Sequence, residues 1–172
     1  MPDLVETRSD RDTVAIRAIR PDDRARIVQA FEALEPRSIY LRFFGPKREL
    51  SVEEVRRVTE PDPARHALVA TVATADRGEI VVGLGEYVGA GSGSAHIAFA
   101  VEEDYQGRGI AGRLLEQLAR IAREKGIARF EADVLAENTP MLKVLRHSGL
   151  PTTESGQDGV VHVTLTLGDR TT

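Results

Sequence analysis

A glycine-rich loop that runs directly into the most regular helical pattern of the sequence constrains the fold more than any other feature. The loop spans residues 106–112. It is followed by apolar residues at helical spacing, and then by a cation and a glycine that are typical of a helix C-terminus: Ile110, Leu114, Leu115, Leu118, Ile121, Ala122, Lys125 and Gly126. Glycines let successive backbone N–H groups approach a ligand at the start of a helix, so this arrangement predicts a pyrophosphate site.

The loop also satisfies the G-x-G-x-x-G spacing of dinucleotide-binding folds, with Asp133 about twenty residues further on. Two features weaken that interpretation. In a dinucleotide fold the first glycine follows the strand directly, whereas here residues 102–106 intervene. Residues 113–172 are also too few for the remaining strand–helix units of that fold. We therefore favour a pyrophosphate loop in a different fold.

The remaining pattern alternates between strands and helices. Strand-like runs occur at 13–19, 66–74, 80–88, 95–101, 130–135 and 160–167, and the three runs between 66 and 101 are expected to be antiparallel neighbours. Helices are expected after Pro21, from about Val52 to Thr59, after Gly109, and from Thr139 to Gly149. Residues 89–94 predict a flexible connection, and 38–44 a short helix or loop on the core. The predicted fold class is α/β (α+β), with a mixed, mostly antiparallel sheet of about six to seven strands and about four flanking helices.

Length and composition favour one domain, which we place at 13–168, with a flexible N-terminus at 1–12 and a tail at 169–172. A net charge of −4 disfavours nucleic acid as the main partner. The lack of cysteine excludes disulfides, thiolate metal sites and a cysteine nucleophile. The histidines lack the close spacing of zinc ligands, and no stretch has the apolar length of a signal peptide or membrane span. We expect a cytoplasmic monomer or homodimer without a metal.

The glycine loop resembles the acetyl-CoA signature of GNAT acyltransferases. Gln106-x-x-Gly109-x-Ala111 is similar to the Q/R-x-x-G-x-G/A motif of that family, and the predicted order of elements follows the family over nearly the whole chain. The resemblance implies a GNAT fold and acetyl-CoA as co-substrate. It also implies which residues contact the pantetheine and pyrophosphate: Phe99, Ala100, Val101, Gln106, Gly107, Arg108, Gly109, Ile110, Ala111, Gly112 and Asn138. Taken alone, Asn138 is equally well explained as a helix cap.

Further segments are similar to the bacterial Pat-type protein lysine acetyltransferases, a group within the GNAT family. They lie at 38–44, at 98–99 with 105–109, and at 135–141. The resemblance implies that Tyr40, Arg42 and Phe44 in the first segment contact a protein acceptor. Relatives of this type usually carry additional domains, and we expect none in this chain.

Acetyl transfer to a lysine needs a base, because only about one lysine in 2,500 is neutral at pH 7. The Pat-type pattern has a glutamate where this sequence has His96, and an imidazole can replace it as base. Glu86 on the preceding strand is the other candidate, either as the base or as the partner of His96. For both residues a solvated position on a strand face is an open alternative. Backbone N–H groups of the strand that ends at Val101 can polarise the thioester carbonyl.

The sequence thus predicts an acetyl-CoA-dependent N-acetyltransferase that modifies a lysine side chain of a protein such as an acyl-CoA synthetase. Two other functions remain open: a small-molecule amine N-acetyltransferase and a non-catalytic acyl-CoA-binding sensor. Many GNAT enzymes have a tyrosine acid where this chain has Leu145. That change does not argue against catalysis, because a thiol with a pKa of about 8.5 leaves without an acid.

Overall fold

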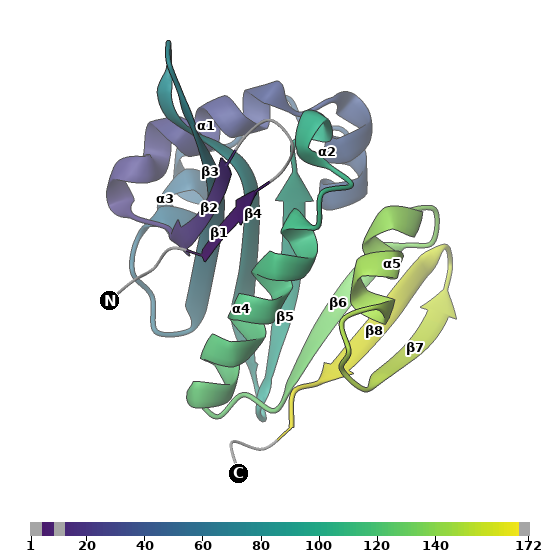
Figure 1. Cartoon of the computed structure of the whole chain (residues 1–172). Coiled ribbons are helices and arrows are strands. Elements are labelled where there is room, and N and C mark those ends of the chain that lie inside the picture. The colour runs from purple at the N-terminus through teal and green to yellow at the C-terminus, as the bar shows by residue number, and fades with distance from the viewer. Residues whose placement is uncertain (1–4, 9–12, 169–172) are drawn as a thin grey trace.

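The computed structural model describes residues 5–8 and 13–168, which contain an eight-stranded sheet (Figure 1). The strand order is β1-β2-β3-β4-β5-β6-β8-β7, and all neighbours are antiparallel except β5 and β6. The strands are β1 (Val5–Arg8), β2 (Thr13–Ala18), β3 (Arg65–Thr74), β4 (Gly78–Gly91), β5 (Ser94–Val101), β6 (Arg129–Leu135), β7 (Thr152–Gln157) and β8 (Val160–Thr166). The helices are α1 (Arg24–Ala33), α2 (Pro36–Phe43), α3 (Val52–Thr59), α4 (Ile110–Glu124) and α5 (Thr139–Arg146), with short 3₁₀ turns η1 (Pro21–Asp23) and η2 (Glu103–Tyr105).

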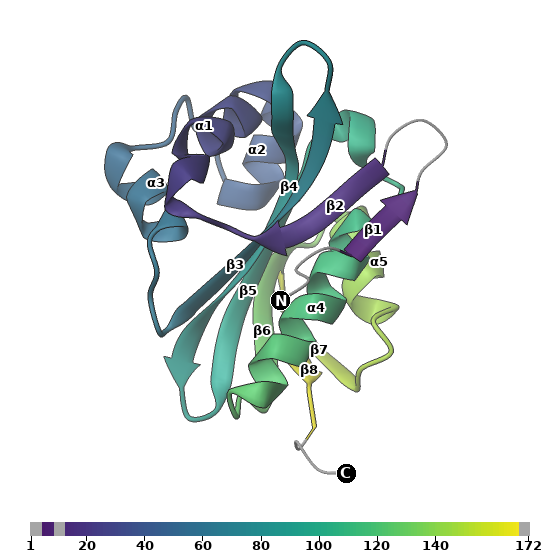
Figure 2. The same cartoon turned by 60° about the vertical axis from the view of Figure 1, so that its left-hand side comes forward.

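Helices cover both faces of the sheet (Figures 1 and 2). α1, α2 and α3 lie on one face, and α4 and α5 lie on the other. α4 is the best-buried helix, since Leu114, Leu115 and Leu118 on its apolar stripe are at most 2% exposed. The loop that precedes α4 is therefore anchored on the main core. Within residues 5–8 and 13–168, no helix is both long and apolar enough to cross a membrane.

The predicted mixed, mostly antiparallel sheet is confirmed, although the described residues form eight strands and five α-helices rather than six or seven and four. Strand β7 escaped prediction because its polar sequence lacks apolar alternation; it is an edge strand with mostly exposed side chains. Pro36 begins α2, which covers most of the segment at 38–44 expected to form a short helix or loop. In the N-terminal segment expected to be flexible, Val5–Arg8 pair with β2. Residues 1–4, 9–12 and the expected tail at 169–172 lie outside the described residues.

The prediction of a flexible connection at residues 89–94 was wrong. β4 continues to Gly91 and β5 begins at Ser94, so a two-residue turn joins them. Ser92 and Gly93 have φ of 54° and 74°. Two positive φ values are what a type I′ hairpin turn requires, and this turn matches the natural twist of the strands it connects. The segment that looked flexible therefore holds β5 in register with β4.

The sheet is open in its middle, between β5 and β6. These strands pair only over Ser94–His96 and Arg129–Glu131 within the described structure, and then they diverge (Figure 1). From Ile97 onward β5 stays paired with β4, whereas β6 stays paired with β8. The glycine loop follows the end of β5, so it lies beside this opening.

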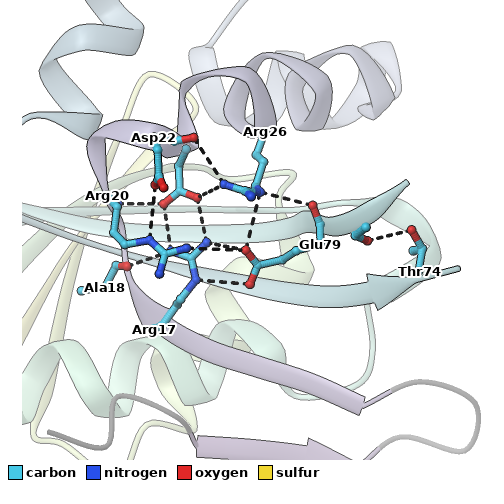
Figure 3. A network of polar contacts seen from close by, with 9 residues as sticks. Arg17, Ala18, Arg20, Asp22, Arg26, Thr74 and Glu79 are labelled. Carbon is cyan, nitrogen blue, oxygen red and sulfur yellow. Dashed lines mark hydrogen bonds and ion pairs between the residues drawn. The ribbon is translucent and has the colours of Figure 1, made fainter. Parts of the chain in front are cut away.

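A buried ionic network joins β2, the start of α1 and β4 (Figure 3). Arg17 donates to the two carboxylate oxygens of Asp23 at 2.7 and 2.8 Å, and to Glu79 at 2.8 Å. Asp23 is fully buried and also accepts from the backbone N–H of Arg20 and from Arg26. Burial alone would raise the pKa of Asp23, but these hydrogen bonds lower it overall. The buried carboxylate is therefore ionised at neutral pH.

We expect Asp23→Ala to lower the free energy of unfolding by about 3–5 kcal/mol, because Arg17 stays buried without its main partner. Asp22→Ala is the matched control. The Asp22 side chain is 72% exposed, so its loss should cost about 0–1 kcal/mol. Urea unfolding at pH 7 measures both, and equal losses would contradict a stabilising role. Because the pKa of Asp23 is lowered in the folded state, its contribution to the free energy of unfolding is present at neutral pH. This contribution is lost as the pH falls through the folded-state pKa.

Candidate active site

The loop between β5 and α4 holds two glycines in a conformation that other residues rarely adopt. Gly107 and Gly109 have φ of 76° and 81°, and Gly109 is the N-cap of α4. A Cβ built on either glycine, or on Gly112, would meet no atom within 4 Å. The space beside the loop can therefore take a ligand. The first turn of α4 has N–H groups without acceptors inside the helix, and a phosphate can accept from them.

Gln106 positions this loop. Its Nε2 donates to the carbonyl oxygen of Val101 at 2.8 Å and lies 3.4 Å from the hydroxyl oxygen of Ser38 in α2. The Gln106 side chain thus links the loop to the end of β5 and to α2. The glutamine of the acetyl-CoA signature has a structural reason to be there, independent of any ligand.

A groove of about 1470 Å³ runs along the open middle of the sheet. Its walls come from α2, β5, the glycine loop, α4, β6 and α5. This volume exceeds the range of about 300–1,000 Å³ typical for drug-sized ligands, as a ligand of the size of acetyl-CoA requires. Of the residues predicted to contact the cofactor, all except Arg108 line it: Phe99, Ala100, Val101, Gln106, Gly107, Gly109, Ile110, Ala111, Gly112 and Asn138.

Arg108 and Asn138 were both predicted to contact the cofactor, and both make contacts within the protein. Nη2 of Arg108 donates to the Asp104 carbonyl at 2.8 Å, and the guanidinium lies over the Tyr105 ring, 4.9 Å from its centroid. Asn138 lines the groove and is also the N-cap of α5, since its Oδ1 accepts from the N–H of Met141 at 3.2 Å. The capping interpretation of Asn138 is therefore correct, and its place in the groove is compatible with a second role.

Sequence reasoning missed Gly85 on β4, which makes room for Phe99, a residue that lines the groove. A Cβ at this position would lie 2.8 Å from the ring of Phe99 and 3.2 Å from Leu114. Phe99 is the cross-strand partner of Gly85 and is buried. The glycine therefore lets the Phe99 ring pack flat against the sheet beneath α4. The signal in the sequence was a glycine inside an apolar strand, which marks a close approach of neighbouring groups.

His96 lies where β5 and β6 separate. It is the last β5 residue paired with β6, opposite Glu131, and it is exposed and lines the groove. Glu131 lies 3.2 Å from Nε2 of His162, whose Nδ1 lies 2.7 Å from Asp133. The hydrogen bond with Asp133 is the main cause that raises the pKa of His162. His96 is thus an accessible imidazole at the edge of a group of carboxylates.

Glu86 has a different environment. It lies on β4 opposite Ala98. The partner of His96 on β4 is Val88, two residues away, so Glu86 and Val88 lie on the same face of the strand. Its side chain is 12% exposed, and its carboxylate lies 2.8 Å from Arg65 and 3.6 Å from Arg42. Among the described residues, its ionic partners are these two arginines and not His96. Of the two candidate bases, His96 is accessible and Glu86 is held between cations.

The residues predicted to contact an acceptor divide into two groups on α2. Tyr40 and Phe44 are 39% and 43% exposed. Arg42 instead turns inward toward Glu86, and its guanidinium lies 4.8 Å from the centroid of the Phe43 ring. Tyr40 and Phe44, which we call the α2 aromatic pair, thus remain open to a partner, while Arg42 forms part of the groove wall.

Comparison with known proteins gives consistent matches. The sequence profile of the acetyltransferase (GNAT) family matches residues 33–150. The structure is similar to the GNAT domain of S. lividans PAT, with a TM-score of 0.84 and 36% identity over 95% of this chain and 96% of that one. An acetyltransferase of Pseudomonas aeruginosa is 28% identical over 138 residues, which cover 80% of this chain and 74% of the relative. Acetyltransferase Pat of Mycolicibacterium smegmatis is 44% identical over 55 residues, which cover 32% of this chain but only 16% of that protein.

Proposed function

Since this chain belongs to the acetyltransferase (GNAT) family, we propose that it transfers acetyl from acetyl-CoA to a lysine side chain of a protein such as an acyl-CoA synthetase. One observation carries the donor half of this proposal: the glycine loop opens into the groove beside the strands that separate. A ligand along this path would have its phosphates at the start of α4 and its thioester beside β5. We also propose that residues 13–168 form one acetyltransferase domain.

The proposed reaction forms an amide and releases CoA. The neutral amine attacks the thioester carbon, the C–S bond breaks with its electron pair on sulfur, and the amine proton passes to a base. That proton then returns through solvent to the thiolate, so that CoA leaves as a thiol. N–H groups of β5 that face the opening would donate to the oxyanion. Leu145 borders the groove, 1% exposed, and offers sulfur no acid; none is needed for a thiol with a pKa of about 8.5.

We assign the role of base to His96 and a structural role to Glu86. A base needs an accessible lone pair, and the carboxylate of Glu86 is already held by Arg65 and Arg42. We place the thioester beside Ala98, which lines the groove. A strand rises about 3.3 Å per residue, so His96 lies about 7 Å along β5 from that point. The imidazole can span that distance directly or through one water.

A protein acceptor is supported by two features of α2. Residues 38–44 resemble the Pat-type protein lysine acetyltransferases, and the α2 aromatic pair is exposed, with Phe44 lining the groove. Arg37 lies beside it and contacts Glu137 of the β6–α5 loop at 3.1 Å. Aromatic side chains together with arginine are enriched at the centres of protein interfaces.

Thiol release measured against a panel of acceptors tests the proposed function. We expect release with an AMP-forming acyl-CoA synthetase, mass spectrometry to locate the acetyl group on a lysine Nζ, and little release with polyamines or aminoglycosides. Release with small amines alone would identify a small-molecule acetyltransferase. Tight acetyl-CoA binding without release to any acceptor would identify a sensor.

Tyr40→Ala should raise the KM for a folded protein acceptor by at least about fivefold, because removing an interface anchor costs more than about 1 kcal/mol of binding free energy. Calorimetric affinity for acetyl-CoA should stay at the wild-type value. Val28→Ala is the matched control, because Val28 on α1 is exposed to the same 39% as Tyr40. Loss of thermal stability and of all activities together in Tyr40→Ala would indicate a packing role and overturn the assignment of a docking surface.

A further inference from the structure

A second cavity lies behind the groove, and the proposed reaction does not use it. Its volume is about 210 Å³, and it lies between α1, α2, α3 and the sheet, with one side open to solvent. Much of its lining is apolar, including Phe31, Leu50, Val58 and Leu84. By water's share of liquid volume, this space corresponds to about seven water molecules. It is therefore large enough for a short aliphatic chain.

Two residues line both spaces, namely Arg42 and Ala100. Ala100 belongs to β5 and has only a methyl side chain. Arg42 therefore forms the partition between the groove and the cavity. The Arg42 side chain crosses from α2 to the carboxylate of Glu86 on β4 at 3.6 Å, and it lies against the Phe43 ring. The Arg42–Glu86 ion pair thus separates the cavity from the groove.

We propose that Arg42 determines which acyl groups the enzyme accepts, by closing the cavity to the end of the acyl chain. This inference rests on the proposed function, which lays the thioester beside β5 at Ala98, the residue opposite Glu86. An acetyl group ends before the partition. A longer chain would meet the guanidinium, and its methylenes would have to displace a charged group from its carboxylate partner. The wild-type protein therefore selects acetyl-CoA and excludes aliphatic acyl-CoAs of four or more carbons.

Shortening Arg42 should join the two spaces without leaving a buried charge unpaired. Glu86 keeps Arg65 at 2.8 Å when Arg42 is removed. The opened passage leads to apolar side chains on α1, α3 and β4, which are suited to methylene groups. Arg42→Ala should thus shift the preference toward longer acyl-CoAs rather than abolish binding.

Calorimetry with acetyl-, butyryl- and hexanoyl-CoA tests this inference. We expect wild-type affinity to fall from acetyl- to butyryl-CoA. In Arg42→Ala we expect the ratio of butyryl-CoA to acetyl-CoA affinity to rise by about tenfold, since each buried methylene contributes about fourfold. Arg42→Met keeps the length of the side chain but not its charge, and it should retain most of the wild-type preference if the partition is mainly steric. An unchanged ratio in Arg42→Ala would overturn the proposal.

Arg57→Ala is the matched control. Arg57 also lines the cavity but does not line the groove, and its side chain is 61% exposed, so its loss should leave the acyl preference unchanged. Should Arg42→Ala fail to fold, the wild-type series decides: hexanoyl-CoA bound as tightly as acetyl-CoA would overturn the partition. Failure of the proposed function is distinguishable: without a donor site the wild-type protein would bind none of the acyl-CoAs, and as a sensor it would bind acetyl-CoA without releasing thiol to any acceptor.

Discussion

Replacing Gly109 with glutamate is expected to weaken acetyl-CoA binding by about 100-fold. Two effects add. A residue with a Cβ is strained at the φ of 81° found there, by about 1–2 kcal/mol, and the backbone relaxes away from the ligand. The new carboxylate also stands in the open space beside the loop, where it repels a pyrophosphate by about 1–4 kcal/mol. Together they amount to about 2–6 kcal/mol, a range that contains the roughly 2.7 kcal/mol that corresponds to 100-fold.

Gly126→Glu controls for strain and charge at the other end of the same helix. Gly126 follows α4, has φ of 79°, and has no atom within 4 Å of an added Cβ. It does not line the groove. This variant should lose comparable stability and keep acetyl-CoA affinity. Calorimetry on both folded variants is decisive, and wild-type affinity in Gly109→Glu would mean that the phosphates bind elsewhere.

Removing the imidazole of His96 is expected to lower kcat/KM at pH 7 by about 100-fold, the usual contribution of a positioned general base. Acetyl-CoA affinity should change little. The defect should shrink as the pH rises from 7 to 10, because lysine has a pKa of about 10.4 and a growing fraction of the amine is neutral without help. Rates of His96→Ala across this range, under saturating acetyl-CoA, measure the effect.

His147→Ala is the control for His96, since His147 also lines the groove and is exposed. It should keep the wild-type rate. Glu86→Gln tests the competing assignment: a pH-dependent loss there, with a normal rate in His96→Ala, would transfer the role of base to Glu86. Normal rates in both variants at neutral pH would leave a water as the base.

The parts of the molecule that sequence predicted best are those set by local chemistry. One continuous segment of the sequence contains the glycine loop, the apolar stripe of α4 and the C-terminal Lys125-Gly126 pair. The structure confirms the conformation predicted for each. The capping box that begins with Ser51 fixes the start of α3 for the same reason. Local hydrogen bonds and helical spacing fix these features before any tertiary contact forms.

The parts that escaped prediction depend on contacts between distant segments. Arg42 and Glu86 are 44 positions apart, and only the packing of α2 over β4 shows that they form an ion pair. Without that contact, the sequence placed Arg42 on a docking surface beside Tyr40. The buried network of Arg17, Asp23 and Glu79 was likewise not predicted, because burial of a charged residue cannot be read from its own neighbours.

The separation of β5 from β6 has a consequence for solubility. An open strand edge presents unpaired backbone groups to other chains and is a hazard for aggregation. The divergence after His96 creates two such edges inside one molecule, in the middle of the sheet rather than at its border. α2 and α5 form part of the walls around this gap. A slender ligand such as the proposed acyl-CoA fits this gap, whereas an incoming strand would need lateral room for a full peptide ladder, so the shape that suits the proposed donor also disfavours pairing with a strand of another chain.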